Sequence, residues 1–215
     1  LKLWPQIVTA HLLGGFATLS LLLLLSLRLS GRVPADIGLG ALRPLARAVL
    51  IIVIIQITLG GWVSSNYAAV ACIDLPTCHG EWWPDMDFAA GFNIFQEIGP
   101  NYLGGMLYGE GRTAIHVTHR IGALITMAAT LWLAWRLYRA GLARTAAGLT
   151  LALCIQLGLG ISNILAHLPL GVAVAHNAFG AVLLLTLVFV NYQLRPVAIR
   201  LNRPKRNAVG YWTPG

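Results

Sequence analysis

The chain has 215 residues, of which 57% are hydrophobic and only 10% are charged. A soluble domain carries about 25% charged residues, so this composition excludes an ordinary soluble fold and provides for several membrane spans. The formal net charge is +8, but the basic residues lie in short clusters between apolar runs and form no basic face, which excludes a nucleic-acid partner. We expect an all-α integral membrane protein.

Five apolar segments are long enough to cross a bilayer, and they should be helices because lipid offers the backbone no other hydrogen-bond partner. They lie at residues 5–27, 45–66, 113–137, 144–166 and 170–193. The chain starts at Leu1, and its first apolar run is too long for a signal peptide. We therefore expect the sequence to come from the middle of a longer protein.

Charge alternates along the connections between these segments. Basic residues gather in three of them: Arg28, Arg32, Arg43 and Arg47; Arg136, Arg139 and Arg144; and Arg195, Arg200, Arg203, Lys205 and Arg206. The connection at 67–112 instead holds six of the seven acidic residues. The positive-inside rule places the basic side in the cytoplasm, with the N-terminus outside and the C-terminus inside.

Two short patterns recur along the chain, as in duplicated membrane bundles. One is Ala-His with a glycine four residues on, at His11 and His176, and the other is Gln-x-x-Leu-Gly, at Gln56 and Gln156. The first pattern predicts that the chain begins with the last helix of one four-helix repeat and continues with a second. Chance similarity between Leu-rich helices is the alternative.

Four histidines lie inside predicted spans: His11, His116, His119 and His176. Ionisable residues at membrane depth are costly and indicate function, although a histidine can also merely bond a neighbouring helix. All except His116 lie about six residues from the outer end of their segments, which is roughly 9 Å at 1.5 Å per residue. This shared level favours a common kind of ligand.

Haem iron fits these histidines better than zinc does. The sequence has no HExxH or CxxC motif, whereas haem needs only one or two axial ligands, often histidine. Small residues near His119 and His176 would leave room for the ring, or would simply pack helices. Arg120 would bind a haem propionate or extend to the interface, and His116 shares a helix face with His119.

The connection at 67–112 contains Cys72 and Cys78, which lie on the oxidising side and favour a disulfide bond. Two free thiols, or a metal site with His79, are the alternatives. The aromatic residues of this connection suit a loop at the membrane interface or a lid over a haem edge. Cys154 lies inside a span, where we expect a buried, inert thiol.

Three motifs together resemble haem A synthase, over essentially the whole chain. They are Leu59-Gly-Gly-Trp-Val-Ser-Ser-Asn66, the Cys72/Cys78 loop with His-Gly-Glu-Trp after it, and Ile115-His-Val-Thr-His-Arg120. The resemblance implies eight helices in two four-helix halves, each with a histidine pair near the outer face. It also implies oxidation of the C8 methyl group of haem O to a formyl group, giving haem A for cytochrome oxidase.

Under this resemblance the five segments look like helices four to eight. His119 and His176 match the axial pair of a resident haem b, and His11 matches one ligand of the substrate haem. The catalytic Glu and the other substrate-haem histidine are expected upstream, and His116 occupies the place of that Glu in the second half. Cys72 and Cys78 match the family's outer cysteine pair. We expect no catalytic residue in this chain and no turnover by it alone.

The implied organisation has four parts: a last helix of the first repeat at 1–28, a cytoplasmic linker at 29–44, a haem-binding bundle at 45–193 with a long outer loop at 67–112, and a basic cytoplasmic tail at 194–215. The implied location is the bacterial inner membrane. The implied partners are haem O and lipid, and the resemblance is compatible with haem O synthase, oxidase assembly factors and a second copy of the chain.

Two other hypotheses about the function remain open from the sequence. A bis-histidine membrane cytochrome, relaying electrons to or from quinone, needs only His119 and His176, but it does not explain His11. A transporter would explain polar residues such as Gln56 and Gln156 inside the spans. It does not require paired histidines.

Overall fold

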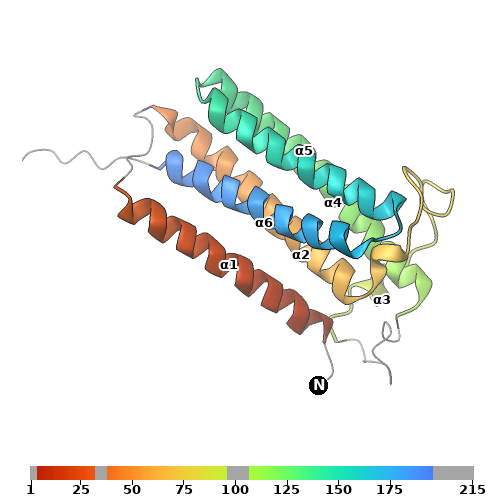
Figure 1. The fold of residues 1–215 in the computed structure, drawn as a ribbon. Coiled ribbons are helices and arrows are strands. Elements are labelled where there is room, and N and C mark those ends of the chain that lie inside the picture. Colours follow the sequence, from red (N-terminus) through yellow and green to blue (C-terminus); the bar gives the residue numbers. More distant parts are fainter. Residues whose placement is uncertain (1–3, 32–37, 96–106, 196–215) are drawn as a thin grey trace, which may run out of the picture.

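The computed structural model describes residues 4–31, 38–95 and 107–195, and this part of the chain is helical apart from one isolated β-bridge (Figure 1). Five long helices are apolar enough to cross a membrane. They are α1 (Pro5–Leu29), α2 (Arg43–Ser65), α4 (Gly109–Arg139), α5 (Ala143–Leu165) and α6 (Leu170–Gln193). The short ones are η1 (Leu39–Leu42), η2 (Ala68–Val70) and α3 (Phe88–Gly91). The predicted fold class, an all-α multi-pass membrane protein, is confirmed.

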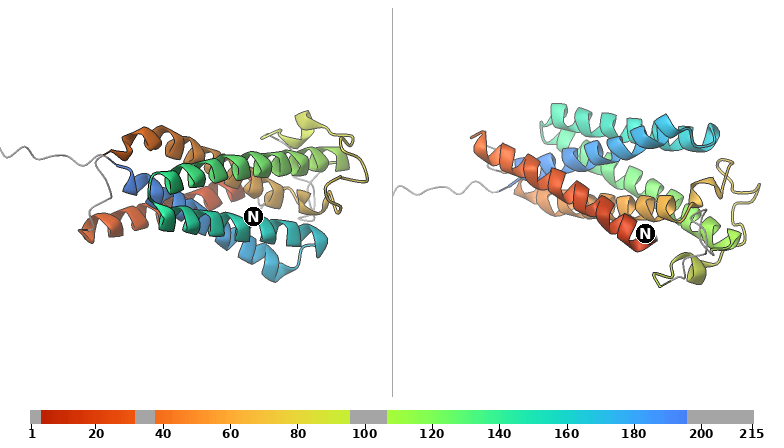
Figure 2. Two further views of the ribbon diagram at one scale, coloured as in Figure 1. Left: turned by 90° about the horizontal axis from the view of Figure 1, so that it is seen from above. Right: turned by 60° about the horizontal axis from the view of Figure 1, so that its bottom comes forward.

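Helices α2, α4, α5 and α6 form a four-helix bundle. Each contacts two others in turn, α2 with α4 and α6, and α5 with α4 and α6. Helix α1 lies outside this bundle, along α2 and α6 (Figures 1 and 2). We call the end of the bundle that carries residues 66–95 the loop end. The N-terminus of α1 and the α5–α6 turn lie at the same end.

Helix α4 differs most from the prediction, because it begins at Gly109 and not near 113. The sequence Gly109-Glu-Gly-Arg112 is too polar for a hydropathy window, yet an acidic Glu110 in the first turn suits the positive end of a helix dipole. His119 therefore lies ten residues into α4, or about 15 Å at 1.5 Å per residue. The prediction of six residues was wrong for this histidine.

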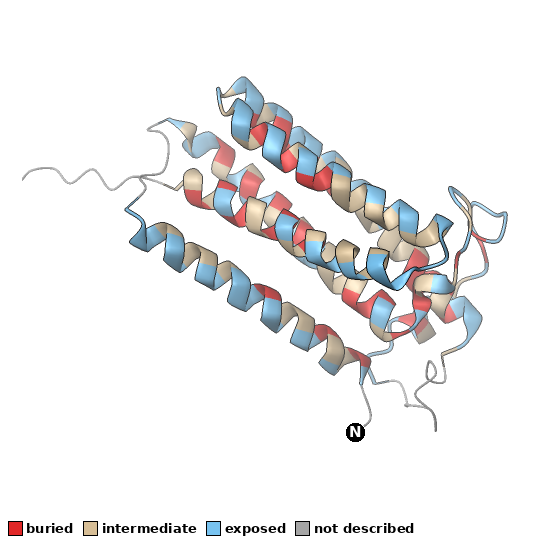
Figure 3. Cartoon of the chain, in the orientation of Figure 1, coloured by how far each residue is buried: buried red, intermediate tan, exposed pale blue. Residues whose placement is uncertain are grey.

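The apolar core fills the half of the bundle away from the loop end (Figure 3). Its fully buried side chains include Val49 of α2, Leu137 of α4 and Leu149 of α5. In α5 the buried residues end at Leu153, and in α6 they begin only at Gly180. Beyond that level, the loop-end parts of α5 and α6 contribute no buried residue to the described structure.

A smaller apolar cluster closes the loop end of α2 and α4, formed by Trp62, Val63, Ala68 and Ile115. Trp62 Nε1 donates a buried hydrogen bond of 2.8 Å to the carbonyl of Gly91 in α3. This bond fastens the connection between α2 and α4 to the bundle. The predicted loop at 67–112 therefore contains η2, α3 and the first turn of α4.

Replacing Gly91 by alanine should loosen this attachment. The added Cβ would lie 2.6 Å from the carbonyl oxygen of Gly111, a main-chain atom that cannot move aside on its own. Such overpacking costs about 1–3 kcal/mol, so we expect a lower thermal unfolding midpoint in detergent. Gly109→Ala is the control, because nothing lies within 4 Å of its added Cβ. Equal midpoints for the two variants would contradict this packing.

Candidate functional site

Two histidines lie against glycines of the preceding helix. A Cβ at Gly60 of α2 would lie 3.2 Å from Cε1 of His119 on α4. A Cβ at Gly160 of α5 would lie 3.1 Å from Cε1 of His176 on α6. Both distances are shorter than ordinary contacts, so the close approach of each imidazole depends on the missing side chain.

A glutamine one turn before each glycine approaches the same imidazole. Gln56 Nε2 lies 3.1 Å from Nδ1 of His119 and donates a 3.0 Å hydrogen bond to the His119 carbonyl. Gln156 Nε2 lies 3.4 Å from Nε2 of His176. The Gln-x-x-Leu-Gly pattern seen in the sequence therefore forms a similar contact twice, to Nδ1 of the ring between α2 and α4 and to Nε2 between α5 and α6.

The imidazoles of His119 and His176 come from α4 and α6, which lie diagonally across the four-helix bundle. Both are half-buried, and they lie near the level where the apolar core stops. The Nδ1 atom of His176 is buried without a hydrogen-bond partner in the described structure. Such an orphaned nitrogen is costly unless it binds something, so this pair is the candidate functional site.

His11 does not join this pair. Near it on α1, Thr9 and Leu12 face Gly61 of α2, one residue beyond the glycine that meets His119. This places His11 near the predicted common level. Its own side chain is exposed, however, and it belongs to a different surface from the histidines inside the bundle.

His116 and Arg120 flank His119 on α4. His116 is buried, only 4% exposed, and its Nδ1 has no hydrogen-bond partner in the described structure. Arg120 reaches the cysteine loop, where its two Nη atoms donate to the carbonyl of Thr77 at 2.8 Å and of Cys72 at 3.0 Å. Its Nε is buried and unpartnered. The arginine next to His119 therefore holds this loop in place.

Cys72 and Cys78 form a disulfide bond, as predicted. Asp74 organises the loop that they close, accepting hydrogen bonds from the Thr77 hydroxyl at 2.6 Å and from the main-chain N–H groups of Gly80 and His79. These donors, that of Thr77 above all, hold the pKa of Asp74 well below its usual range. The carboxylate therefore stays charged at any ordinary pH.

The structure also bears on two further predictions, a metal site with His79 and a buried thiol at Cys154. The Nε2 atom of His79 lies 2.7 Å from the carbonyl of Ala71, and the described residues contain no group of three or more His, Cys, Asp or Glu side chains that could hold a metal ion. Cys154 is exposed on α5, so the prediction of a buried thiol was wrong. Lipid is as apolar as a protein core, and hydropathy cannot tell which one a thiol faces.

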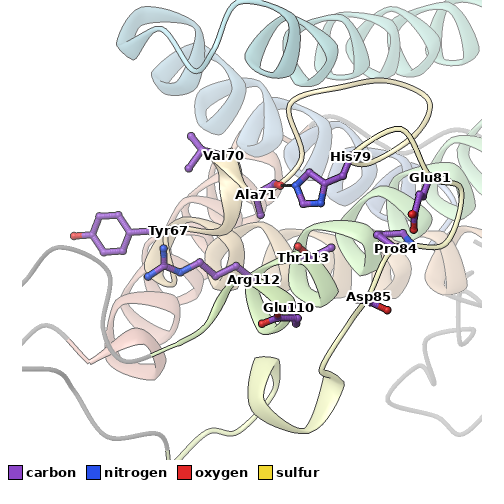
Figure 4. A pocket seen from close by; sticks show the side chains of 11 residues that line it. Tyr67, Val70, Ala71, His79, Glu81, Pro84, Asp85, Glu110, Arg112 and Thr113 are labelled. Carbon is purple, nitrogen blue, oxygen red and sulfur yellow. Dashed lines mark hydrogen bonds between the residues drawn. The ribbon is translucent and has the colours of Figure 1, made fainter.

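A pocket of about 460 Å³ lies at the loop end, between η2, the cysteine loop and the start of α4 (Figure 4). Its charged lining is mixed, with Glu81, Asp85 and Glu110 beside His79 and Arg112. None of the predicted haem-site residues lines it. It is therefore a feature of the loop end, separate from the histidine pair.

Known proteins match almost the entire chain. Residues 1–188 match the model of the COX15-CtaA family, described as "Cytochrome oxidase assembly protein". The chain belongs to this family. Proteins named "Heme A synthase" from Shewanella oneidensis, Nitrosospira multiformis and Rhodospirillum centenum are similar to it, with 49%, 32% and 31% identity. The similar regions cover 90%, 87% and 86% of this chain.

The chain spans only part of each of these relatives: 60% of the Shewanella protein, 52% of the Nitrosospira protein and 48% of the Rhodospirillum protein. The resemblance to haem A synthase noted from three motifs is thereby confirmed at the level of the family. Sequence reasoning missed two features of the site. It found Gln56 and Gln156 only as a repeated pattern, and it gave Asp74 no role.

We expect Arg120→Ala to expose the cysteine loop. The substitution removes two hydrogen bonds from a charged donor, and each such bond contributes about 1.5–3 kcal/mol. The Cys72–Cys78 bond should then be reduced at least about tenfold faster by a mild thiol, measured by alkylation and mass spectrometry. Arg139→Ala is the control, because Arg139 stacks on Trp135 at the other end of α4. Equal rates in both variants would contradict the loop contact.

Proposed function

We propose that this chain is the C-terminal part of a haem A synthase, and that His119 and His176 are the axial ligands of a resident haem b. The observation that carries the proposal is the two half-buried histidines of α4 and α6, each against a glycine and an amide of a neighbouring helix, in a chain that belongs to this family. Two histidines on separate helices, at one level of a bundle, suit a flat macrocycle between them.

The residues present fit a haem. The unpartnered Nδ1 of His176 and the unpartnered Oε1 atoms of Gln56 and Gln156 are polar atoms that a bound group could organise. The buried side chains of α5 and α6 end near this level, at Leu153 and Gly180. Cys154 of α5, the free cysteine of the described residues, is exposed and offers no thiolate to the imidazoles.

When bound, haem b supplies a one-electron redox centre. The chain's own residues would bind and orient it: His119 and His176 at the iron, and Gly60 and Gly160 as the close backbone contacts behind the rings. Arg120 follows His119 in α4, and its buried, unpartnered Nε would donate to a haem propionate. His116, buried three residues before His119 in α4, would support this ligand from the same face of the helix.

The substrate side of the proposal depends on His11. We propose that His11, exposed on α1, faces the substrate haem O together with residues upstream, including the catalytic Glu. Conversion of a methyl to a formyl group takes one oxygen from water and releases four protons and four electrons, the electrons passing to an external oxidant.

The proposed setting is the bacterial inner membrane, with the loop end outside and the basic tail in the cytoplasm.

Substitution of either axial histidine should abolish the resident haem spectrum. We expect the purified protein to show a low-spin bis-histidine spectrum, and His119→Ala or His176→Ala to lose it, because one axial nitrogen disappears. His167→Ala is the control, since His167 is exposed in the α5–α6 turn. An unchanged low-spin spectrum in both ligand variants would refute the assignment.

The enzyme proposal is tested with the full-length gene in cells that supply haem O. We expect haem A to accumulate, measured by chromatography of extracted haems, and we expect His11→Ala in that background to stop it while the haem b spectrum persists. Intact haem b without any haem A from the unmodified gene would instead favour the electron-relaying cytochrome.

A further inference from the structure

Two side-chain amides, those of Gln56 and Gln156, lie beside the proposed axial histidines. Gln56 and Gln156 lie four residues before Gly60 and Gly160, so each amide and its glycine share one face of a helix. Each such face meets the imidazole of one histidine on another helix of the bundle. A similar arrangement occurs on two pairs of helices, with Gln56 at Nδ1 of His119 and Gln156 at Nε2 of His176.

Resting on the proposed haem b site, we propose that Gln56 is the positioning residue of His119, and that Gln156 is its looser counterpart at His176. A histidine that ligates a metal uses its second ring nitrogen to bond a neighbour, and that bond fixes both the ring plane and the tautomer. Gln56 approaches Nδ1 of His119, which leaves Nε2 as the ligand nitrogen.

The amide of Gln56 is fixed more firmly than a single contact would allow. Its nitrogen is within hydrogen-bond distance of both Nδ1 and the main-chain carbonyl of His119. Its oxygen packs against Gly122 of α4, where an added Cβ would overlap it. Gly122 is therefore the position that admits the amide between the two helices.

The oxygen of Gln56 also provides the acceptor that a ligating histidine needs. It is buried and has no hydrogen-bond partner in the described structure. An amide presents either its NH₂ group or its oxygen after a half-turn about its last bond. On haem binding the amide makes this half-turn and exchanges its bond to the His119 carbonyl for one from Nδ1 of the ring, which leaves Nε2 unprotonated for the iron.

The second amide is held less tightly. Gln156 is 3.4 Å from Nε2 of His176, near the limit for a hydrogen bond, and it makes no bond to the His176 main chain. A Cβ at Gly180 would meet Gln156 Nε2 at 3.5 Å, which is an ordinary contact. We therefore expect substitution of Gln56 to weaken haem b binding more than substitution of Gln156 does.

The test uses the full-length protein and follows its resident haem b. We expect Gln56→Leu to weaken haem b binding by about 10- to 100-fold, the usual effect of losing such a partner, and to change the low-spin electron paramagnetic resonance signals. Gln156→Leu should have a smaller effect. Gln193→Leu is the matched control, because this amide pairs with Thr145 at the opposite end of α6.

Two further variants separate positioning from general packing. Gln56→Glu keeps the shape and adds a stronger acceptor, so it should restore haem binding and lower the midpoint potential below that of the unmodified protein, because the imidazole becomes more basic. Gly122→Ala should reproduce the Gln56→Leu signals with the amide still present. If Gln56→Leu fails to fold, haem affinity and midpoint potential in Gln56→Glu and the resonance signals of Gly122→Ala test the inference.

Equal haem affinity, resonance signals and midpoint potential in the Gln56, Gln156 and Gln193 variants would overturn the inference, as would equal losses in all three. The proposed function stands after either result if His119→Ala and His176→Ala still abolish the low-spin spectrum. If those histidine variants keep the spectrum, the proposed function itself fails.

Discussion

Polar side chains inside an apolar helical bundle must pair with each other, because neither lipid nor core offers them a partner. This constraint organises the loop-end half of the molecule. The apolar core ends near Leu153 of α5 and Gly180 of α6. At that level each imidazole meets an amide, and glycines let the helices approach closely enough for the pairing. The histidine site thus begins where hydrophobic packing ends.

The spans were predictable because each is a long apolar run, and hydropathy measures that property directly. The start of α4 was not, since its first turn is polar and lies beyond the apolar part of the helix. The outward orientation of Cys154 was equally hidden, because a residue facing lipid and one facing the core have the same hydropathy. Composition therefore fixes which segments are helices more securely than how each helix is rotated.

The candidate site was predictable in its histidines and not in their partners. His119 and His176 are conspicuous, since ionisable residues are rare in spans. The contact between Gln56 and His119 joins residues 63 positions apart, and it depends on the rotation of two helices about their axes. A sequence pattern showed that Gln56 and Gln156 recur. Only the packed structure relates this recurrence to the imidazoles, and Arg120 to the carbonyls of the cysteine loop.

The two amide–imidazole contacts are similar in design and unequal in strength, and the inequality follows from their surroundings. His119 lies between Gln56, which bonds both its ring and its main chain, and Arg120, which fastens the disulfide-closed loop. His176 has one long contact to a side-chain amide and an unpartnered Nδ1. α4 is therefore the firmly held side of the site and α6 the more adaptable one. If a planar ligand binds between them, His119 would set its position and His176 would adjust to it. The two helices then need not be placed with equal precision.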